Sequence, residues 1–343
     1  MTAESPTIAE LNAPPVRFCF VVHALSRLHR GIMGVRSANM GLVGQWSDGT
    51  HPADVMRVCS LSLAGVAEGM VLAVPMVPED LLSNQERAVE RMQQAVELAG
   101  AVDAVGLGSL CAVVGGRGEE LASRLSVPVT NGGAATAWAI LENTRTVLQH
   151  RPSGRVAVLG SRGPVGRVVA ASLAKEGVEV CVDHPRAAKG LDVQSAMGPA
   201  AAVQGCSVVV GAGPTGGTLP GQALGRGTIV VDVAIPGTII GRPDPSVTVL
   251  AGEAVTFPGH WNRGVWGWLY HVLSGYGPAQ VFACLLEPLV LASLHRETPF
   301  SIGRKLTVDD VAAFGVAAAE LGFRPHLSRG WRSFSPSQLQ ISG

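Results

Sequence analysis

The sequence predicts an α/β chain, with a first α/β domain, then a doubly wound parallel sheet, then C-terminal helices. The main observation lies mid-chain: the apolar run 156–159 is followed by glycines at 160, 163 and 166 and by an apolar helical face that ends at Gly177. Further β-branched runs at 178–182, 206–210 and 228–232 each end in a short loop. Parallel strands with such loops are typical of a Rossmann sheet.

The glycine spacing predicts a dinucleotide site. Gly160 permits a sharp turn, Gly163 lets the backbone approach a pyrophosphate, and Gly166 lets the next helix pack closely on its strand. Free N–H groups at the helix N-terminus then face the phosphates. We expect the dinucleotide to contact this turn and a later strand end, namely Gly160, Ser161, Arg162, Gly163, Pro164, Val165, Gly166, Gly211 and Ala212.

The second strand of this domain ends at Asp183. An acid at this place usually binds the ribose 2′-hydroxyl and repels a 2′-phosphate, which favours NAD(H). Arg186 or Lys189, just beyond, can bind a 2′-phosphate instead. These residues leave both coenzymes open.

Composition excludes several classes of protein. The 26 Lys and Arg residues balance 26 Asp and Glu residues, which argues against an electrostatic nucleic-acid binder. The six cysteines form no CxxC pair and no Cys/His cluster, so neither a metal site nor a disulfide framework is expected. The N-terminal residues show no signal-peptide pattern and no apolar run spans a bilayer, so we expect a cytoplasmic protein without a transmembrane segment.

The expected organisation has five parts. They are a mobile arm over 1–15, an α/β substrate domain over 16–150, the Rossmann domain over 151–255, a helical segment over 256–327 and a loose tail over 328–343.

In the first domain we expect a strand at 16–22, helices from 78 and over 85–98, strands at 104–105 and 125–129, and a helix over 135–148. His23 follows the first strand directly and is a candidate substrate-binding residue. The alternative is that His23 is a hydrogen-bonded residue of the scaffold.

Beyond the Rossmann domain, residues 258–276 are rich in glycine and aromatic residues, which can form ordinary packing or an apolar wall for a substrate. Helices are expected over 279–295, with Pro278 at its start, and over 308–321, with Thr307 as N-cap.

Residues 280–287, Gln-Val-Phe-Ala-Cys-Leu-Leu-Glu, resemble the Q-x-F-A-C-x-x-E motif of the cyanobacterial-type long-chain acyl-(acyl-carrier-protein) reductases, which form aldehydes. Phe-Ser-Ile-Gly-Arg at 300–304 and Gly-Phe-Arg-Pro at 322–325 are similar to further motifs of this family. The resemblance runs from about residue 18 to residue 325, and the chain looks like a divergent member.

The resemblance implies that Cys284 attacks an acyl thioester carried on acyl carrier protein or coenzyme A, and that NADPH reduces the acyl-enzyme to an aldehyde. NADH remains the alternative because of Asp183. The first domain would bind the acyl group, and Gln280 of the motif is a candidate substrate-binding residue. An aldehyde-consuming enzyme is an expected partner, and peripheral membrane contact is a further expectation.

The chain also departs from the family. Pro288 removes the N–H partner of the Cys284 carbonyl, which predicts a kink or bulge at the cysteine. Counted from Pro278, Cys284 lies past the first helical turn, where the helix dipole lowers its pKa only weakly. Gly133, Ala134 and Ala135 replace polar residues of the family. The five other cysteines are expected to be structural.

Two other functions remain open. One is a non-covalent two-domain dehydrogenase of a small polar substrate, although the first domain has no lysine for the expected Lys/Asp pair. The other is a non-catalytic partner that retains a nucleotide site.

Overall fold

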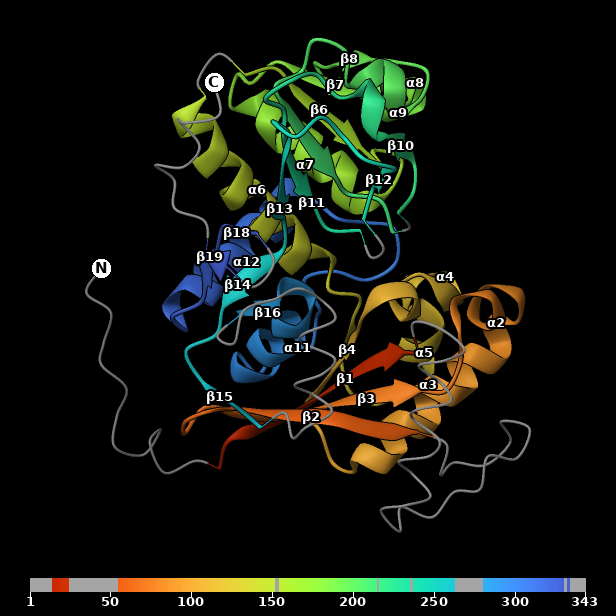
Figure 1. The fold of residues 1–343 in the computed structure, drawn as a ribbon. Helices are drawn as coiled ribbons and strands as arrows, with labels where there is room; N and C mark the ends of the chain where they lie inside the picture. The colour runs from red at the N-terminus through yellow and green to blue at the C-terminus, as the bar shows by residue number, and fades with distance from the viewer. Residues whose placement is uncertain are drawn as a thin grey trace.

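The computed structural model describes residues 14–24, 55–151, 154–214, 216–234, 237–262, 280–329 and 332–333. They form two lobes, each around a six-stranded sheet (Figure 1). The predictions for residues 1–13, for the aromatic residues at 263–276, for the helix start at Pro278 and for the end of the tail lie outside the described residues.

The first sheet has the order β15-β2-β3-β1-β4-β5. β1 pairs in parallel with β3 and β4, whereas β2 runs antiparallel to β3 and β15. β1 is a near-continuous apolar run because both of its faces are covered. The bounds are β1 Val16–His23, β2 Met56–Leu63, β3 Ala67–Val74, β4 Ala104–Leu107, β5 Val129–Thr130 and β15 His260–Asn262.

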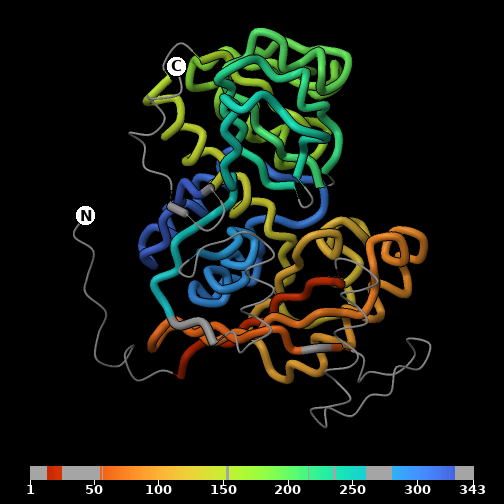
Figure 2. Tube along the Cα trace, viewed as in Figure 1, coloured from red at the N-terminus to blue at the C-terminus, as the bar shows by residue number. Residues whose placement is uncertain are grey.

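One face of this sheet is covered by local helices, and the other by a helix from far along the chain. Cys19 and Val21 of β1 pack with Met92 of α3, in a layer that also holds α2, α4 and α5. Phe20 lies on the opposite face, against α11. In Figure 2 the C-terminal segment, in blue, lies between the lobes. The bounds are α2 Pro78–Ser83, α3 Gln85–Ala99, α4 Val114–Arg117, α5 Glu119–Arg124, α6 Gly133–His150 and α11 Ala283–Ser293.

The second sheet is fully parallel, with the order β13-β11-β9-β6-β7-β8. Counted along this lobe, the order is 3-2-1-4-5-6, that of a doubly wound sheet. The prediction of a parallel α/β sheet is therefore confirmed. The bounds are β6 Val156–Leu159, α7 Pro164–Lys175, β7 Val180–Val182, α8 Pro185–Ala188, β8 Gln194–Ser195, α9 Pro199–Ala202, β9 Val208–Gly211, β11 Ile229–Asp232 and β13 Thr248–Ala251.

Short elements join the lobes and line the second one. β14 pairs antiparallel with β16 and β17, which ties the end of the second lobe to the C-terminal helices. The bounds are η3 Ser109–Ala112, β10 Leu219–Pro220, η4 Gly221–Ala223, β12 Ile239–Ile240, β14 Ala254–Thr256, β16 Gln280–Phe282, α12 Val308–Glu320, β17 Arg324–Pro325, β18 Ser328–Arg329 and β19 Arg332–Ser333. In the part of the chain that the structure describes, no helix combines the length and apolar character needed to cross a membrane.

The helix predicted over 279–295 is wrong at its start. Residues 280–282 form strand β16, because their backbone pairs with β14, and the helix begins only at Ala283. Cys284 is therefore the second helical residue, not a residue beyond the first turn. Pro288 lies inside α11, and the helix continues through it without a break, so the predicted bulge at the cysteine is not observed.

Two further boundaries differ from the prediction. The strand expected at 125–129 is reduced to β5, since Pro128 has no N–H to donate to a ladder. The start of the tail is not loose, because β18 pairs with β19. The predicted cap of α12 is confirmed: the Thr307 hydroxyl accepts from the Asp310 N–H, and the Asp310 carboxylate accepts from the Thr307 N–H.

A buried carboxyl joins the C-terminal helix to the first lobe. Glu287 of α11 is fully buried, and one of its oxygens accepts hydrogen bonds from the hydroxyls of Thr130 and Ser301, the latter at 2.7 Å. The other oxygen accepts from the Ala135 N–H at 2.9 Å, in the first turn of α6. Burial raises the pKa of Glu287, and these donors oppose that rise.

We predict that Glu287→Ala lowers the free energy of unfolding by roughly 3 kcal/mol, because the Ala135 N–H and two hydroxyls lose a buried acceptor. Glu287→Gln, which keeps one acceptor oxygen, is expected to lower it less. Urea unfolding followed by circular dichroism measures both values. Glu297→Ala, at an exposed position, is the control, and equal effects at 287 and 297 would contradict the prediction.

Candidate functional site

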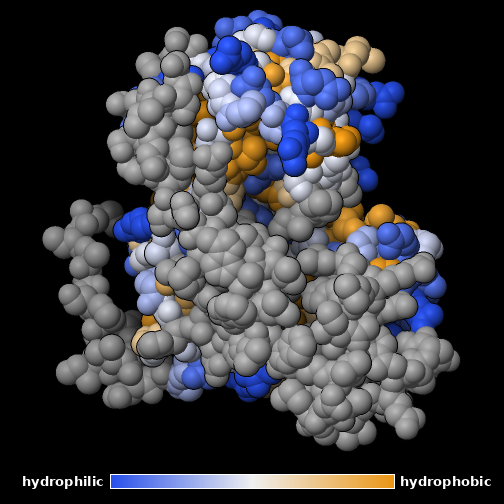
Figure 3. Space-filling view, viewed as in Figure 1, coloured by the Kyte–Doolittle hydropathy of each residue, from blue (hydrophilic) through white to orange (hydrophobic). Residues whose placement is uncertain are grey.

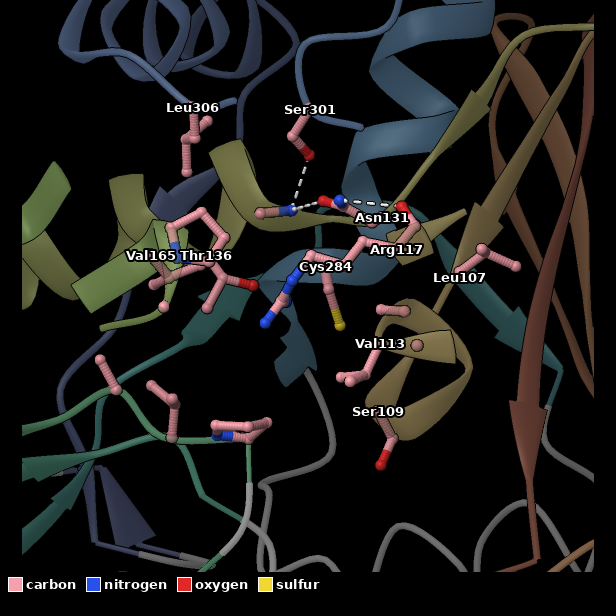
Figure 4. Close-up of a pocket in the computed structure, with 18 of the residues that line it drawn as sticks. Leu107, Ser109, Val113, Arg117, Asn131, Thr136, Val165, Cys284, Ser301 and Leu306 are labelled. Atoms are coloured by element: carbon pink, nitrogen blue, oxygen red, sulfur yellow. Dashed lines mark hydrogen bonds between the residues drawn. The ribbon is translucent and has the colours of Figure 1, made fainter. Parts of the chain in front are cut away.

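A cleft of about 1190 Å³, partly open to solvent, separates the lobes. The carboxyl ends of β1 and β4 form one wall, and the loops after β6, β9 and β11 form the other. Apolar atoms are visible in Figure 3 where the lobes face each other. The side chains that Figure 4 labels at this cleft are Leu107, Ser109, Val113, Arg117, Asn131, Thr136, Val165, Cys284, Ser301 and Leu306.

The glycine turn after β6 has the close contacts that its spacing predicts. Gly160 has a φ of +74°, and a Cβ there would lie 2.6 Å from the Gly213 nitrogen. A Cβ at Gly166 would lie 2.6 Å from the Gly160 oxygen. No side chain caps the N-terminus of α7 at Gly163, so its first N–H groups are available to an anion. Gly163, Pro164, Val165 and Ala212 line the cleft.

Asp183 binds this turn directly. Its carboxylate accepts from the Gly160 N–H at 2.8 Å, from the Ser161 N–H at 3.2 Å and from the Ser161 hydroxyl. Arg162, which follows Ser161, and Arg186, three residues after Asp183, are exposed. Gly211, at the end of β9, must be small, because a Cβ there would lie 2.5 Å from the Asp232 carboxylate.

Cys284 is half-buried at the start of α11, and Figure 4 shows its sulfur directed into the cleft. Gly132 allows a close approach, since a Cβ there would lie 2.5 Å from the Cys284 Cβ. Burial raises the pKa of this thiol well above its usual value, and the negative charges of Glu253 and Glu287 add to the rise. The thiol is therefore protonated at neutral pH, and its role as a nucleophile stays a prediction.

The other two candidate residues lie outside the cleft lining. His23 is 2% exposed; its Nδ1 lies 2.9 Å from the Ala24 carbonyl oxygen and its Nε2 lies 3.0 Å from the Ser109 hydroxyl. The carbonyl oxygen can only accept, so Nδ1 of His23 carries a proton. Gln280 is buried and accepts from the Ser328 hydroxyl at 2.9 Å. The cysteines expected to be structural, namely Cys19, Cys59, Cys111, Cys181 and Cys206, are buried.

Sequence reasoning missed Glu253, which lines the cleft beside Cys284. It lies in the turn after β13, and two backbone carbonyls hold this turn in place. The Gly252 carbonyl accepts from the Asn143 side-chain amide at 3.0 Å, and the Glu253 carbonyl accepts from the Ala283 N–H at 3.0 Å. Burial, with the charge of Asp232, raises its pKa to about 8. Its place just after a parallel strand was the available signal.

Sequence reasoning also missed Arg117, Ser109 and Lys305, all of which line the cleft. The glycines around Arg117 and the small-residue loop that holds Ser109 were the available signals. Nothing local singles out Lys305.

No family model matches the chain, so the resemblance to the acyl-(acyl-carrier-protein) reductases stays a prediction. The aminotransferase PigE of a Serratia species is 28% identical over 278 residues, which are 75% of this chain and 32% of that protein. The chain thus spans about a third of this curated relative. This finding overturns the expectation of an aldehyde-forming acyl-thioester reductase that works through a Cys284 acyl-enzyme, because the relative is an aminotransferase.

Solved structures with a weak likeness include a Trypanosoma brucei methylenetetrahydrofolate dehydrogenase-cyclohydrolase complexed with NADP cofactor and inhibitor. It is 15% identical with a TM-score of 0.34, over 82% of this chain and 86% of that chain. The L-tryptophan dehydrogenase of Nostoc punctiforme is 14% identical with a TM-score of 0.27, over 64% and 62% of the two chains.

We predict that Glu253→Gln removes a pH dependence of stability. The native pKa of about 8 lies above the ordinary value of 4.5, so the stability that the neutral carboxyl contributes is complete below pH 4.5 and is lost as the pH rises to about 8. The free energy of unfolding of Glu253→Gln, minus that of the wild type, should therefore increase over this pH range, by up to roughly 4 kcal/mol. Urea unfolding at several pH values measures it, with the exposed Glu97→Gln as control, and parallel pH curves for wild type and Glu253→Gln would contradict it.

Proposed function

We propose that the chain is an oxidoreductase that uses a nicotinamide dinucleotide. The observation that carries this is the shared cleft: the glycine turn and α7 N-terminus open into the same space as Glu253, Cys284 and Ser109. A ligand held at this turn thus reaches polar groups from both walls of the cleft. When bound, the coenzyme supplies or accepts a hydride.

The described residues fit a dinucleotide. The uncapped N-terminus of α7 suits a pyrophosphate, and Gly163 leaves room for it. Asp183 already accepts three hydrogen bonds from the turn, so its negative charge is partly compensated. Arg162 and Arg186, which are exposed and close to Ser161 and Asp183 in the sequence, suit a 2′-phosphate, which supports NADPH over NADH.

Glu253 suits the proton that accompanies hydride transfer. Its raised pKa keeps the carboxyl neutral at pH 7, so it can donate to an oxygen that gains charge in the cleft. The Ser109 hydroxyl, oriented by His23, is a second polar group on the opposite wall. The lining also includes apolar residues such as Phe20 and Phe282.

The curated relative supports an enzyme without fixing the reaction, because the chain matches only 32% of that protein. Acyl carrier protein, coenzyme A thioesters and an aldehyde-consuming enzyme stay predictions as partners. Transamination is pyridoxal-phosphate chemistry, which uses a lysine Schiff base. Pyridoxal phosphate is therefore the contrasting ligand in the test below.

We predict that NADPH binds to the full chain and that the double variant Arg162→Ala/Arg186→Ala weakens NADPH binding about tenfold while it leaves NADH binding nearly unchanged. The reason is that only NADPH has the 2′-phosphate. Isothermal titration calorimetry measures the affinities. Arg226→Ala is the matched control, because Arg226 is exposed and precedes the start of β11. It therefore lies at the amino ends of the parallel strands, whereas the glycine turn lies at their carboxyl ends.

Turnover is checked by oxidation of NADPH with a panel of aldehydes, ketones and 2-oxo acids. Binding of pyridoxal phosphate without binding of either dinucleotide would reject the proposal. So would dinucleotide binding without hydride transfer to any carbonyl of the panel.

A further inference from the structure

The first lobe contains a strained turn that ends in the cleft. Gly115, Gly116, Arg117 and Gly118 have φ values of +55°, +64°, +62° and +91°. Glycine adopts this conformation freely, whereas an L side chain is strained there. Among the described residues only Ser109, Arg117 and His295 are non-glycine residues with positive φ, and the first two line the cleft. Strain of this kind clusters at functional sites.

Neighbouring elements hold this turn in place. The Arg117 carbonyl oxygen accepts from the Asn131 amide at 3.2 Å and from the Gly303 N–H at 3.1 Å. Figure 4 shows the first of these bonds. The Gly115 N–H donates to the Gln85 side chain at 3.2 Å. The Arg117 backbone is therefore fixed from three sides, and its side chain starts from a set position at the cleft.

Among the residues that the structure describes, the Arg117 guanidinium has no acidic partner. It is half-buried, and no carboxylate of the described residues lies within 4.0 Å of it. Burial lowers the pKa of Arg117, and the positive charge of Arg304 lowers it further. A half-buried cation beside a like charge is unfavourable until an anion compensates it.

The charges around the cleft favour an anion. Lys305 is a second cation in the lining. Of the nearby acids, Glu253 is neutral at pH 7 and Glu287 is buried among its own donors. Glu119 is not part of the lining, and its carboxylate lies near the backbone of Gly303 and Gly116. Much of the remaining lining is apolar, including Phe20, Val22, Leu107, Val113, Phe282 and Leu306.

We propose that Arg117 binds the oxyanion of a substrate whose other part is apolar, with Lys305 as a second positive charge. The planar guanidinium suits a carboxylate or a phosphate monoester, because it can donate two parallel hydrogen bonds to either. The apolar part of the substrate lies against the hydrophobic lining. This inference names the substrate class for the proposed oxidoreductase and in that respect rests on it.

The test is calorimetric titration of the full chain, with and without NADPH, using hexanoate, hexyl phosphate and hexan-1-ol. The probes share one apolar chain and differ in charge. We expect at least one anion to bind about tenfold more tightly than the alcohol, and the two anions to distinguish carboxylate from phosphate. Equal affinities for all three probes, or no binding of either anion, would overturn the proposal.

Arg117→Gly separates binding from folding. Glycine relieves the backbone strain and removes the unpaired charge, so the Tm should not fall, while the preference for anions over the alcohol should disappear. Arg117→Lys keeps the charge without the planar fork and should retain only part of the preference. Arg124→Gln, which removes an exposed charge on α5, is the matched control and should change nothing. Unchanged anion binding in Arg117→Gly would overturn the proposal.

The two proposals fail in different ways. Anion binding that depends on Arg117 in a chain that binds no dinucleotide would reject the oxidoreductase and keep the anion site. Dinucleotide binding without a preference for anions over the alcohol would reject the anion site and keep the oxidoreductase. The double variant Arg162→Ala/Arg186→Ala should keep anion binding, and its loss there would place the anion on the second lobe instead.

Discussion

The arrangement of the cleft depends on one buried carboxyl, that of Glu287. It joins three segments that are far apart in the sequence: α11, the junction of β5 with α6, and the loop at Ser301. Cys284 stands one turn before it on the same helix. Asn131 and Gly303, which hold Arg117, lie one residue after Thr130 and two residues after Ser301, both of which bind Glu287. Because a buried acceptor must keep its donors, this network fixes the first-lobe wall of the cleft.

The cleft combines groups whose protonation follows from burial. Glu253 lies close enough to Cys284 to raise the pKa of the thiol, and burial favours the neutral form of both groups. Arg117 is half-buried as well, but a guanidinium keeps its proton in proteins. At neutral pH the lining therefore offers neutral proton donors together with a fixed positive charge. This suits an anionic substrate and a reaction that needs a proton, and it does not suit a resting thiolate.

The comparisons limit which activity can be assigned. The match to an aminotransferase corrects the function that the cysteine motif suggested, although it covers a third of that relative. The motif Q-x-F-A-C-x-x-E is present in the chain, but its first residues form a strand and its glutamate serves as a buried link. The motif residues thus have structural roles in this chain, and these roles account for much of the motif.

The sequence by itself determined the second lobe. The glycines at 160, 163 and 166 and the β-branched runs are local signals, since a tight turn and a buried strand depend on residues close together in the chain. The sequence also determined the cap at Thr307 and the burial of five cysteines. Only the tertiary structure decided that 280–282 is a strand, because that depends on pairing with β14, and that Glu287 faces Thr130, 157 residues away. The positions of Glu253 and Arg117 in one cleft were likewise decided by the contact between lobes, which no local pattern records.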